Sequence, residues 1–183
     1  HITAEKIIYS IDKLNFKKGI NLIKGPSGSG KTSLLLAFAN LNKNVNFKYK
    51  YKKDSPEKYS VNFTSQSTIL TGKKVKDSII AGRDSKVKLL KKFEILLFNC
   101  FDNISLETST KSLSGGQIKI IAFLRSLYSE KKYHLFDEIF SGVDKSTAKK
   151  CLKFIKENFK ENIFIIVDHN TLDINEVENL IEV

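Results

Sequence analysis

Cysteine is scarce in this chain of 183 residues, which contains only Cys100 and Cys151. The two lie far apart in sequence, show no C-x-x-C spacing and have no histidine close by, so no metal or redox chemistry is indicated. We interpret them as buried structural thiols in a reducing compartment. Histidine is almost as scarce, with His1, His134 and His169.

Long hydrophobic runs are also missing. A bilayer-spanning helix needs roughly 18–20 consecutive apolar residues, whereas the longest runs here are LLLAFA, IIAFL and IFIIV. There is no basic segment followed by an apolar one with a small-residue cleavage site, so a secretory leader is not indicated. The chain begins with His1 rather than Met, which leaves open that it is excised from a longer, membrane-fused chain.

Acidic residues are fewer than basic ones, and the chain carries a formal net charge of +11. Such a balance invites a nucleic-acid or an acidic-membrane interpretation. The lysines are scattered along the chain rather than gathered into one arm, so we interpret them as a solvated surface and do not expect nucleic acid as a partner.

Strands and helices alternate along most of the chain, which is typical of an α/β fold with a mostly parallel sheet. The start, KIIYSIDKLNFKKG, predicts short N-terminal antiparallel β strands, and NFKYKYK predicts a half-buried one. Further strands are predicted at INLIKG, YSVNFT, KYHLFDE, NIFIIVDH and ENLIEV. Helices are predicted at KTSLLLAFANL, across residues 73–101, after the double glycine and at DKSTAKKCLKFIKENF. We expect one domain, residues 1–183.

The segment GPSGSGKT, Gly25–Thr32, matches G-x-x-x-x-G-K-[ST] and lies between a predicted strand and a predicted helix. In such a loop the backbone N–H groups point at phosphate oxygens, the lysine reaches the β and γ phosphates, and the hydroxyl suits Mg²⁺. We therefore predict a nucleotide site formed by Gly25, Pro26, Ser27, Gly28, Ser29, Gly30, Lys31, Thr32 and Ser33.

Two acids end a predicted buried strand at LFDE. A magnesium ion held by Thr32 needs a second anchor at the end of a neighbouring strand, and Asp137 is placed to supply it. Glu138 follows directly, so we predict that it acts as the general base, or orients the water, for γ-phosphate hydrolysis.

The segment LSGGQ, Leu113–Gln117, places two glycines at the start of a predicted helix, with Ser114 at the position of a helix cap. Bare N–H groups at a helix start bind anions well. This second anion site needs an explanation, because the chain already carries a phosphate loop.

With the phosphate loop, LSGGQ and LFDE in this order, the chain resembles the ATP-binding domain of ABC transporters over nearly its whole length. The resemblance implies a RecA-like P-loop NTPase core of residues 1–65 and 115–183, with a small helical subdomain at 66–114. It also implies that Gln66 coordinates Mg²⁺ and the attacking water, and that His169 is a catalytic switch histidine. Asp144 would belong to the family's D-loop at the nucleotide site, and it can also cap the helix that follows it.

In the family that this chain resembles, two domains associate head to tail around two Mg-ATP. The phosphate loop of one domain and the signature segment of the other bind each ATP. The resemblance therefore implies a second such domain as partner, most simply in a homodimer. Ser114, Gly115, Gly116 and Gln117 would contact the γ-phosphate of the partner's nucleotide, which accounts for the second anion site.

The stretch STILTGKKVKDSIIAGR, after Gln66, resembles exporter-type domains, in which this surface receives coupling helices of a membrane domain. The implied function is ATP hydrolysis that drives export of a peptide, lipid or drug, at the cytoplasmic face of the cell membrane. The alternative is a soluble ABC ATPase acting on ribosomes or nucleic acid. A non-catalytic nucleotide sensor is a third interpretation, which the intact Lys31, Asp137, Glu138 and His169 oppose.

The sequence departs from the family pattern in three places. The aromatic residue that stacks on adenine has no clear counterpart, and Tyr9 lies too close to the phosphate loop to serve. His134 interrupts an otherwise apolar strand. The interval of 48 residues from Gln66 to Ser114 (114 − 66) predicts a compact helical subdomain.

Overall fold

The structure, a computed structural model, describes residues 14–41, 61–169 and 172–183. Tyr9, most of the expected N-terminal strands and the expected strand NFKYKYK lie outside these ranges. Residues 14–18 of the expected N-terminal region contain no strand.

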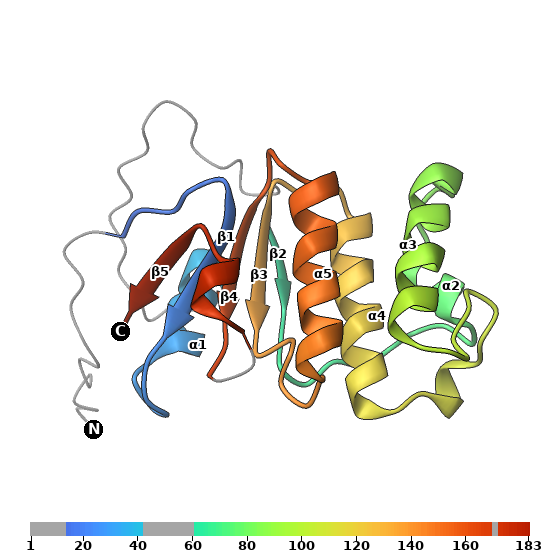
Figure 1. The fold of residues 1–183 in the computed structure, drawn as a ribbon, viewed down its shortest axis with the longest axis horizontal. Coiled ribbons are helices and arrows are strands. Elements are labelled where there is room, and N and C mark those ends of the chain that lie inside the picture. The colour runs from blue at the N-terminus through green and yellow to red at the C-terminus, as the bar shows by residue number, and fades with distance from the viewer. Residues whose placement is uncertain (1–13, 42–60, 170–171) are drawn as a thin grey trace, which may run out of the picture.

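A five-stranded sheet forms the centre of the described chain, in the order β2-β3-β4-β1-β5 (Figure 1). All of its strand pairs are parallel, as strand–helix alternation predicts. The strands are β1 (Gly19–Lys24), β2 (Val61–Thr64), β3 (Tyr133–Asp137), β4 (Ile163–Val167) and β5 (Asn179–Glu182).

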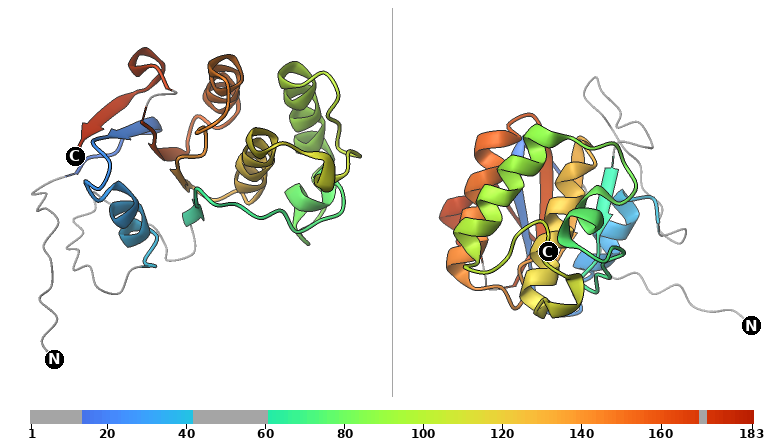
Figure 2. Two further views of the ribbon diagram at one scale, coloured as in Figure 1. Left: turned by 90° about the horizontal axis from the view of Figure 1, so that it is seen from below. Right: turned by 90° about the vertical axis from the view of Figure 1, so that its right-hand side faces the viewer.

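Helices cover both faces of the sheet (Figure 2). The helix α1 (Lys31–Phe38) lies on one face, and α4 (Gly115–Tyr128) and α5 (Lys145–Asn158) lie on the other. Alternate strand residues enter two separate hydrophobic clusters: Leu135 packs on the α1 side and Phe136 on the α4–α5 side. This period of two is the expected pattern for a strand buried on both faces.

Two further helices, α2 (Val75–Ile80) and α3 (Val87–Cys100), lie at the end of the molecule opposite β5 (Figure 1). The prediction of helix across residues 73–101 is therefore confirmed, with a break at Ala81–Lys86. Phe93 of α3 and Ile79 of α2 join the same hydrophobic cluster as α4 and α5. The short helices η1 (Thr110–Ser112) and η2 (Ile174–Glu176) complete the elements of the described ranges.

The histidine that interrupts β3 is fully buried. The His134 ring stacks on Phe164 at 5.1 Å between centroids, and its Nδ1 lies 3.0 Å from Ser126 Oγ. Its Nε2 lies 3.3 Å from Asn162 Nδ2. Burial disfavours the charged ring and lowers the pKa of His134 to about 4. His134 is thus a neutral, hydrogen-bonded part of the core.

This burial predicts a loss of stability on mild acidification. In the unfolded chain a histidine titrates near its ordinary pKa of about 6.5, so between that pH and pH 4 the unfolded state binds more protons than the folded one. The free energy of unfolding should fall by about 2 kcal/mol between pH 7 and pH 5. Denaturant titrations at both pH values measure it.

His134→Phe retains an aromatic ring against Phe136 and Phe164 and should remove most of this pH dependence. His169→Asn, at a half-exposed position, is the matched control and should retain it. An equal slope in the wild type and His134→Phe would contradict the assignment.

Candidate functional site

The predicted phosphate loop joins the end of β1 to the start of α1. Gly28 and Gly30 have positive φ angles of 82° and 94°, a backbone conformation that residues with a Cβ rarely adopt. Gly30 is the N-cap residue of α1 and offers no side chain to cap the helix. The first N–H groups of α1 therefore open into the loop, as an anion site requires.

Lys31 is a buried cation that the loop holds by its own carbonyl groups. Its Nζ donates to Pro26 O at 2.7 Å and to Gly25 O at 2.9 Å, and it forms no ion pair with any described residue. The hydroxyl oxygen of Ser29 is buried without a described hydrogen-bond partner. A buried cation and an unsatisfied hydroxyl in one loop fit a phosphate group, because it supplies charge and acceptor oxygens.

The acid expected to anchor Mg²⁺ lies at the end of β3. The Thr32 hydroxyl lies 3.0 and 3.1 Å from the two carboxylate oxygens of Asp137. Burial raises the pKa of the Asp137 carboxyl, while the Thr32 hydrogen bond opposes the rise. A hydroxyl beside one buried carboxylate fits Mg²⁺, which binds one or two carboxylates together with substrate phosphates.

The side chains of Gln66 and His169 meet on Glu138. Gln66 Nε2 donates to Glu138 Oε2 at 2.7 Å, and His169 Nε2 lies 3.1 Å from Glu138 Oε1. The three residues follow β2, β3 and β4, which are neighbours in the sheet. Ligand sites of α/β proteins form at this edge, where the carboxyl ends of parallel strands meet.

The backbone at Glu138 has a positive φ of 51°, which is uncommon for a residue with a Cβ. Lys119 of α4 holds this turn, because its Nζ donates to Glu138 O at 3.1 Å and to Ser141 O at 2.8 Å. Lys119 is a residue that the sequence analysis missed. Its signal was its position in the signature helix, five residues after Ser114 (119 − 114).

The signature segment begins α4 as predicted. Ser114 caps the helix: its Oγ accepts from Gln117 N at 3.3 Å, and Gln117 Oε1 accepts from Ser114 N at 2.8 Å. A Cβ on Gly115 would meet open space, whereas a Cβ on Gly116 would lie 3.0 Å from Gly142 O. Gly115 therefore faces open space, and Gly116 permits close packing within the chain.

The signature segment does not close over the phosphate loop of its own chain. Figures 1 and 2 show the start of α4 well apart from the connection between β1 and α1. Asp144, expected in the D-loop and as a helix cap, caps α5: its Oδ1 accepts from Thr147 N at 2.9 Å. Hydrogen bonds from Thr147 lower the pKa of Asp144.

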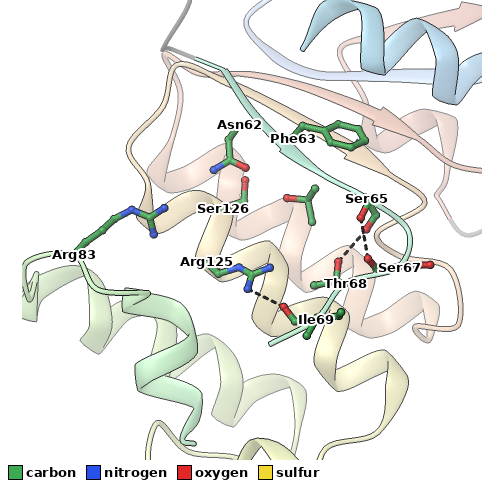
Figure 3. Close-up of a pocket in the computed structure, with 10 residues that line it drawn as sticks. Asn62, Phe63, Ser65, Ser67, Thr68, Ile69, Arg83, Arg125 and Ser126 are labelled. Carbon is green, nitrogen blue, oxygen red and sulfur yellow. Dashed lines mark hydrogen bonds between the residues drawn. The ribbon is translucent and has the colours of Figure 1, made fainter. Parts of the chain in front are cut away.

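A polar pocket of about 280 Å³ lies beside Gln66, between β2, the segment 65–69, α4 and the turn after α2 (Figure 3). Arg125 donates to Ile69 O at 3.0 Å, and Arg83 to Ile80 O at 3.3 Å. Neither guanidinium is paired with a described carboxylate. Burial, and then the nearby Arg83 charge, lower the pKa of Arg125.

A glycine-rich loop between a strand and a helix, a buried lysine within it, and an acid pair at the end of a neighbouring parallel strand define a P-loop NTPase domain. No helix in the described ranges is long and apolar enough to cross a bilayer.

A family model described as ABC transporter matches residues 13–141, which is more than half of the chain. The chain belongs to the ABC transporter family, whose domains of this kind bind ATP. The resemblance inferred from the motifs is thereby confirmed.

Similar proteins are ABC transporters. The chain is 25% identical over 92% of its length to ATP-binding cassette transporter abc1 of Schizosaccharomyces pombe, and 30% identical over 88% to ABC transporter NFT1 of Saccharomyces cerevisiae. It spans only 12% and 15% of those two proteins. The solved structure of a bacterial Atm1-family ABC exporter with ATP bound matches with a TM-score of 0.72 at 18% identity, over 91% of this chain and 32% of that one. This likeness shows the shared fold.

The surroundings of Lys31 predict that its loss lowers ATP affinity but does not lower the melting temperature. Lys31→Met removes the charge-assisted hydrogen bonds that the lysine would donate to the phosphates of ATP. Such bonds are worth about 1.5–3 kcal/mol, so ATP affinity should fall roughly 10- to 150-fold. The melting temperature without nucleotide should not fall, because the variant removes a buried cation held only by carbonyl groups. Titration with a fluorescent ATP analogue and thermal melts measure the two effects.

The exposed Lys88→Met is the matched control and should change neither quantity. Unchanged ATP affinity in Lys31→Met would remove this lysine from the nucleotide site.

Proposed function

We propose that the chain is the ATP-binding and ATP-hydrolysing domain of an ABC exporter. The observation that carries the proposal is the Glu138 carboxylate, held by Gln66 and His169 at the same sheet edge as the Thr32–Asp137 pair. We keep residues 1–65 and 115–183 as the ATP-binding core and residues 66–114 as a helical subdomain.

Each residue of the site has a distinct part in this proposal. The loop N–H groups, Ser29 and Lys31 bind the phosphates of ATP. Thr32, Asp137 and Gln66 would hold Mg²⁺, which supplies charge neutralisation on the β and γ phosphates when bound. Glu138 accepts the proton of the attacking water, Gln66 orients that water, and His169 positions the Glu138 carboxylate.

A complete site would need a second copy of the domain. The open space at Gly115 and the N-terminus of α4 suit the γ-phosphate of a nucleotide bound to a partner, with Ser114, Gly116 and Gln117 alongside. Two domains related head to tail would thus complete two sites, and Asp144 would lie in the contact between them.

Glu138→Gln should separate binding from hydrolysis. The amide retains the size of the side chain but cannot serve as a base, so turnover should fall by roughly 10²–10⁴-fold while ATP binding persists. Phosphate release and light scattering in saturating Mg-ATP should show an inactive, ATP-bound dimer. Near-normal turnover would exclude Glu138 as the base.

The dimer contact is tested by adding Gly115→Arg to Glu138→Gln. Position 115 is open within one chain, so the arginine should leave the fold and monomer ATP binding intact and prevent dimerisation. A thermal melt of the double variant against Glu138→Gln alone is the control for the stability of α4. A dimer that survives Gly115→Arg would contradict the contact in trans.

The export part of the proposal concerns the pocket beside Gln66 (Figure 3). The pocket lies on the surface that, in exporter-type domains, receives the membrane domain. Arg83 and Arg125 line this pocket and have no described carboxylate partner, so they suit an acidic side chain on a segment of the membrane domain that inserts here. This docking would place the domain at the cytoplasmic face of the membrane, attached to a fused or separate membrane domain. Cargo would never contact it.

Arg83→Glu should therefore uncouple the domain from its membrane partner. In the full-length protein, ATP-driven transport should fall severalfold while ATP affinity stays unchanged, because Arg83 is exposed and lies outside the nucleotide site. Lys88→Glu, a charge reversal at an exposed position outside the pocket, is the control. Equal transport by both variants would exclude this docking surface.

The net charge of +11 favours a second candidate function, a soluble ABC ATPase that acts on ribosomes or nucleic acid. Fractionation of the natural full-length protein with a carbonate wash distinguishes the two. Retention in membranes until detergent is added supports export, whereas sedimentation with ribosomes or nucleic acid supports the alternative.

A further inference from the structure

The two cysteines, distant in sequence, lie on helices that pack against each other. Lys92 Nζ of α3 donates to Asn158 Oδ1 of α5 at 2.8 Å, and Lys150 Nζ of α5 donates to Asn99 O of α3 at 2.6 Å. A forward step along α3 thus corresponds to a backward step along α5, so the helices run antiparallel. Cys100 and Cys151 directly follow Asn99 and Lys150 in sequence, next to this hydrogen bond between the two helices.

The two thiols differ in exposure. Cys151 is fully buried in the core cluster, as the sequence analysis expected, whereas Cys100 is only half-buried at its edge. The expectation of two buried thiols was therefore wrong for Cys100. The reason is its place at the last residue of α3, where the chain leaves the helix contact.

The surroundings favour the thiolate of Cys100 over that of Cys151. A side-chain hydrogen bond from Cys151 is the main effect that lowers the pKa of Cys100, and the Lys150 charge adds to it. The same hydrogen bond and complete burial raise the pKa of Cys151. An accessible thiol of lowered pKa beside a second cysteine is the arrangement found in redox-sensing cysteines.

We propose that Cys100 and Cys151 form a redox-sensitive pair, which a hydroperoxide converts into a disulfide joining α3 to α5. The Cys100 thiolate attacks the peroxide oxygen, which yields a sulfenic acid and releases hydroxide or alkoxide. The Cys151 thiol then attacks the Cys100 sulfur, the S–O bond breaks, and water leaves. The peroxide is reduced and two thiols are oxidised to one disulfide. A thiol reductant reverses the product.

The disulfide would tie two parts of the proposed domain together. Helix α3 belongs to the segment between Gln66 and Ser114, and α5 packs directly on the sheet that holds Asp137 and Glu138. Oxidation would therefore fix the helical segment against the nucleotide-binding core. The chemistry of the pair does not depend on ATP hydrolysis, so it can be tested whether or not the proposed function holds.

The test uses the natural full-length protein. After brief treatment with hydrogen peroxide, free thiols are blocked with N-ethylmaleimide and the protein is digested with trypsin without reductant. We expect residues 93–111 and 151–153 to appear as one disulfide-linked peptide, lighter by two hydrogen atoms than the two free peptides together. Dithiothreitol should separate it. Cys100 and Cys151 recovered only as maleimide adducts would overturn the proposal.

Single-cysteine variants test the order of events. Cys151→Ser should stop at the sulfenic acid, which dimedone labels at Cys100, while the wild type should show much less labelling. Cys151→Ala provides the same test if serine is not tolerated in the core. Cys100→Ser should leave Cys151 unreacted. Equal dimedone labelling of the wild type and both Cys151 variants would show that Cys151 does not resolve the sulfenic acid and would overturn the pair.

Discussion

The candidate site depends on the parallel alignment of β1, β2, β3 and β4. Because the carboxyl ends of parallel strands share one edge, the residues that follow each strand are brought together. Lys31 and Thr32 follow β1, and Gln66 follows β2. Asp137 ends β3, Glu138 comes directly after it, and His169 follows β4. An antiparallel neighbour would send one of these groups to the opposite edge, and the contacts on Glu138 could not form.

Other residues of the chain hold the polar groups of the site in place. The loop carbonyls hold Lys31, Thr32 orients Asp137, and Gln66 and His169 hold both oxygens of Glu138. The positive φ at Glu138 has an energetic cost, and the two hydrogen bonds from Lys119 stabilise the turn against it. Because these polar groups are already in position, they need to reorient little when charge develops in a transition state.

Much of the fold was predictable from local patterns. Alternating and continuous apolar runs indicated β1, β2, β3, β4 and β5, and the glycine pair, Ser114 and Asp144 indicated the starts of α4 and α5. Other features were not predictable, because they depend on neighbours that are distant in sequence. His134 looked like an interruption of β3, yet Ser126, Asn162 and the Phe164 ring accommodate it.

The sequence by itself determined the class of protein, because the phosphate loop, LSGGQ and the acid pair are contiguous motifs whose chemistry depends on local spacing. Only the tertiary structure decided which side chains meet. It placed Gln66 and His169 on one carboxylate, brought Lys119 to the Glu138 turn, and packed the helix of Cys100 against the helix of Cys151. The physical reason is that strand order and helix register set contacts between distant segments, and no local pattern contains that information.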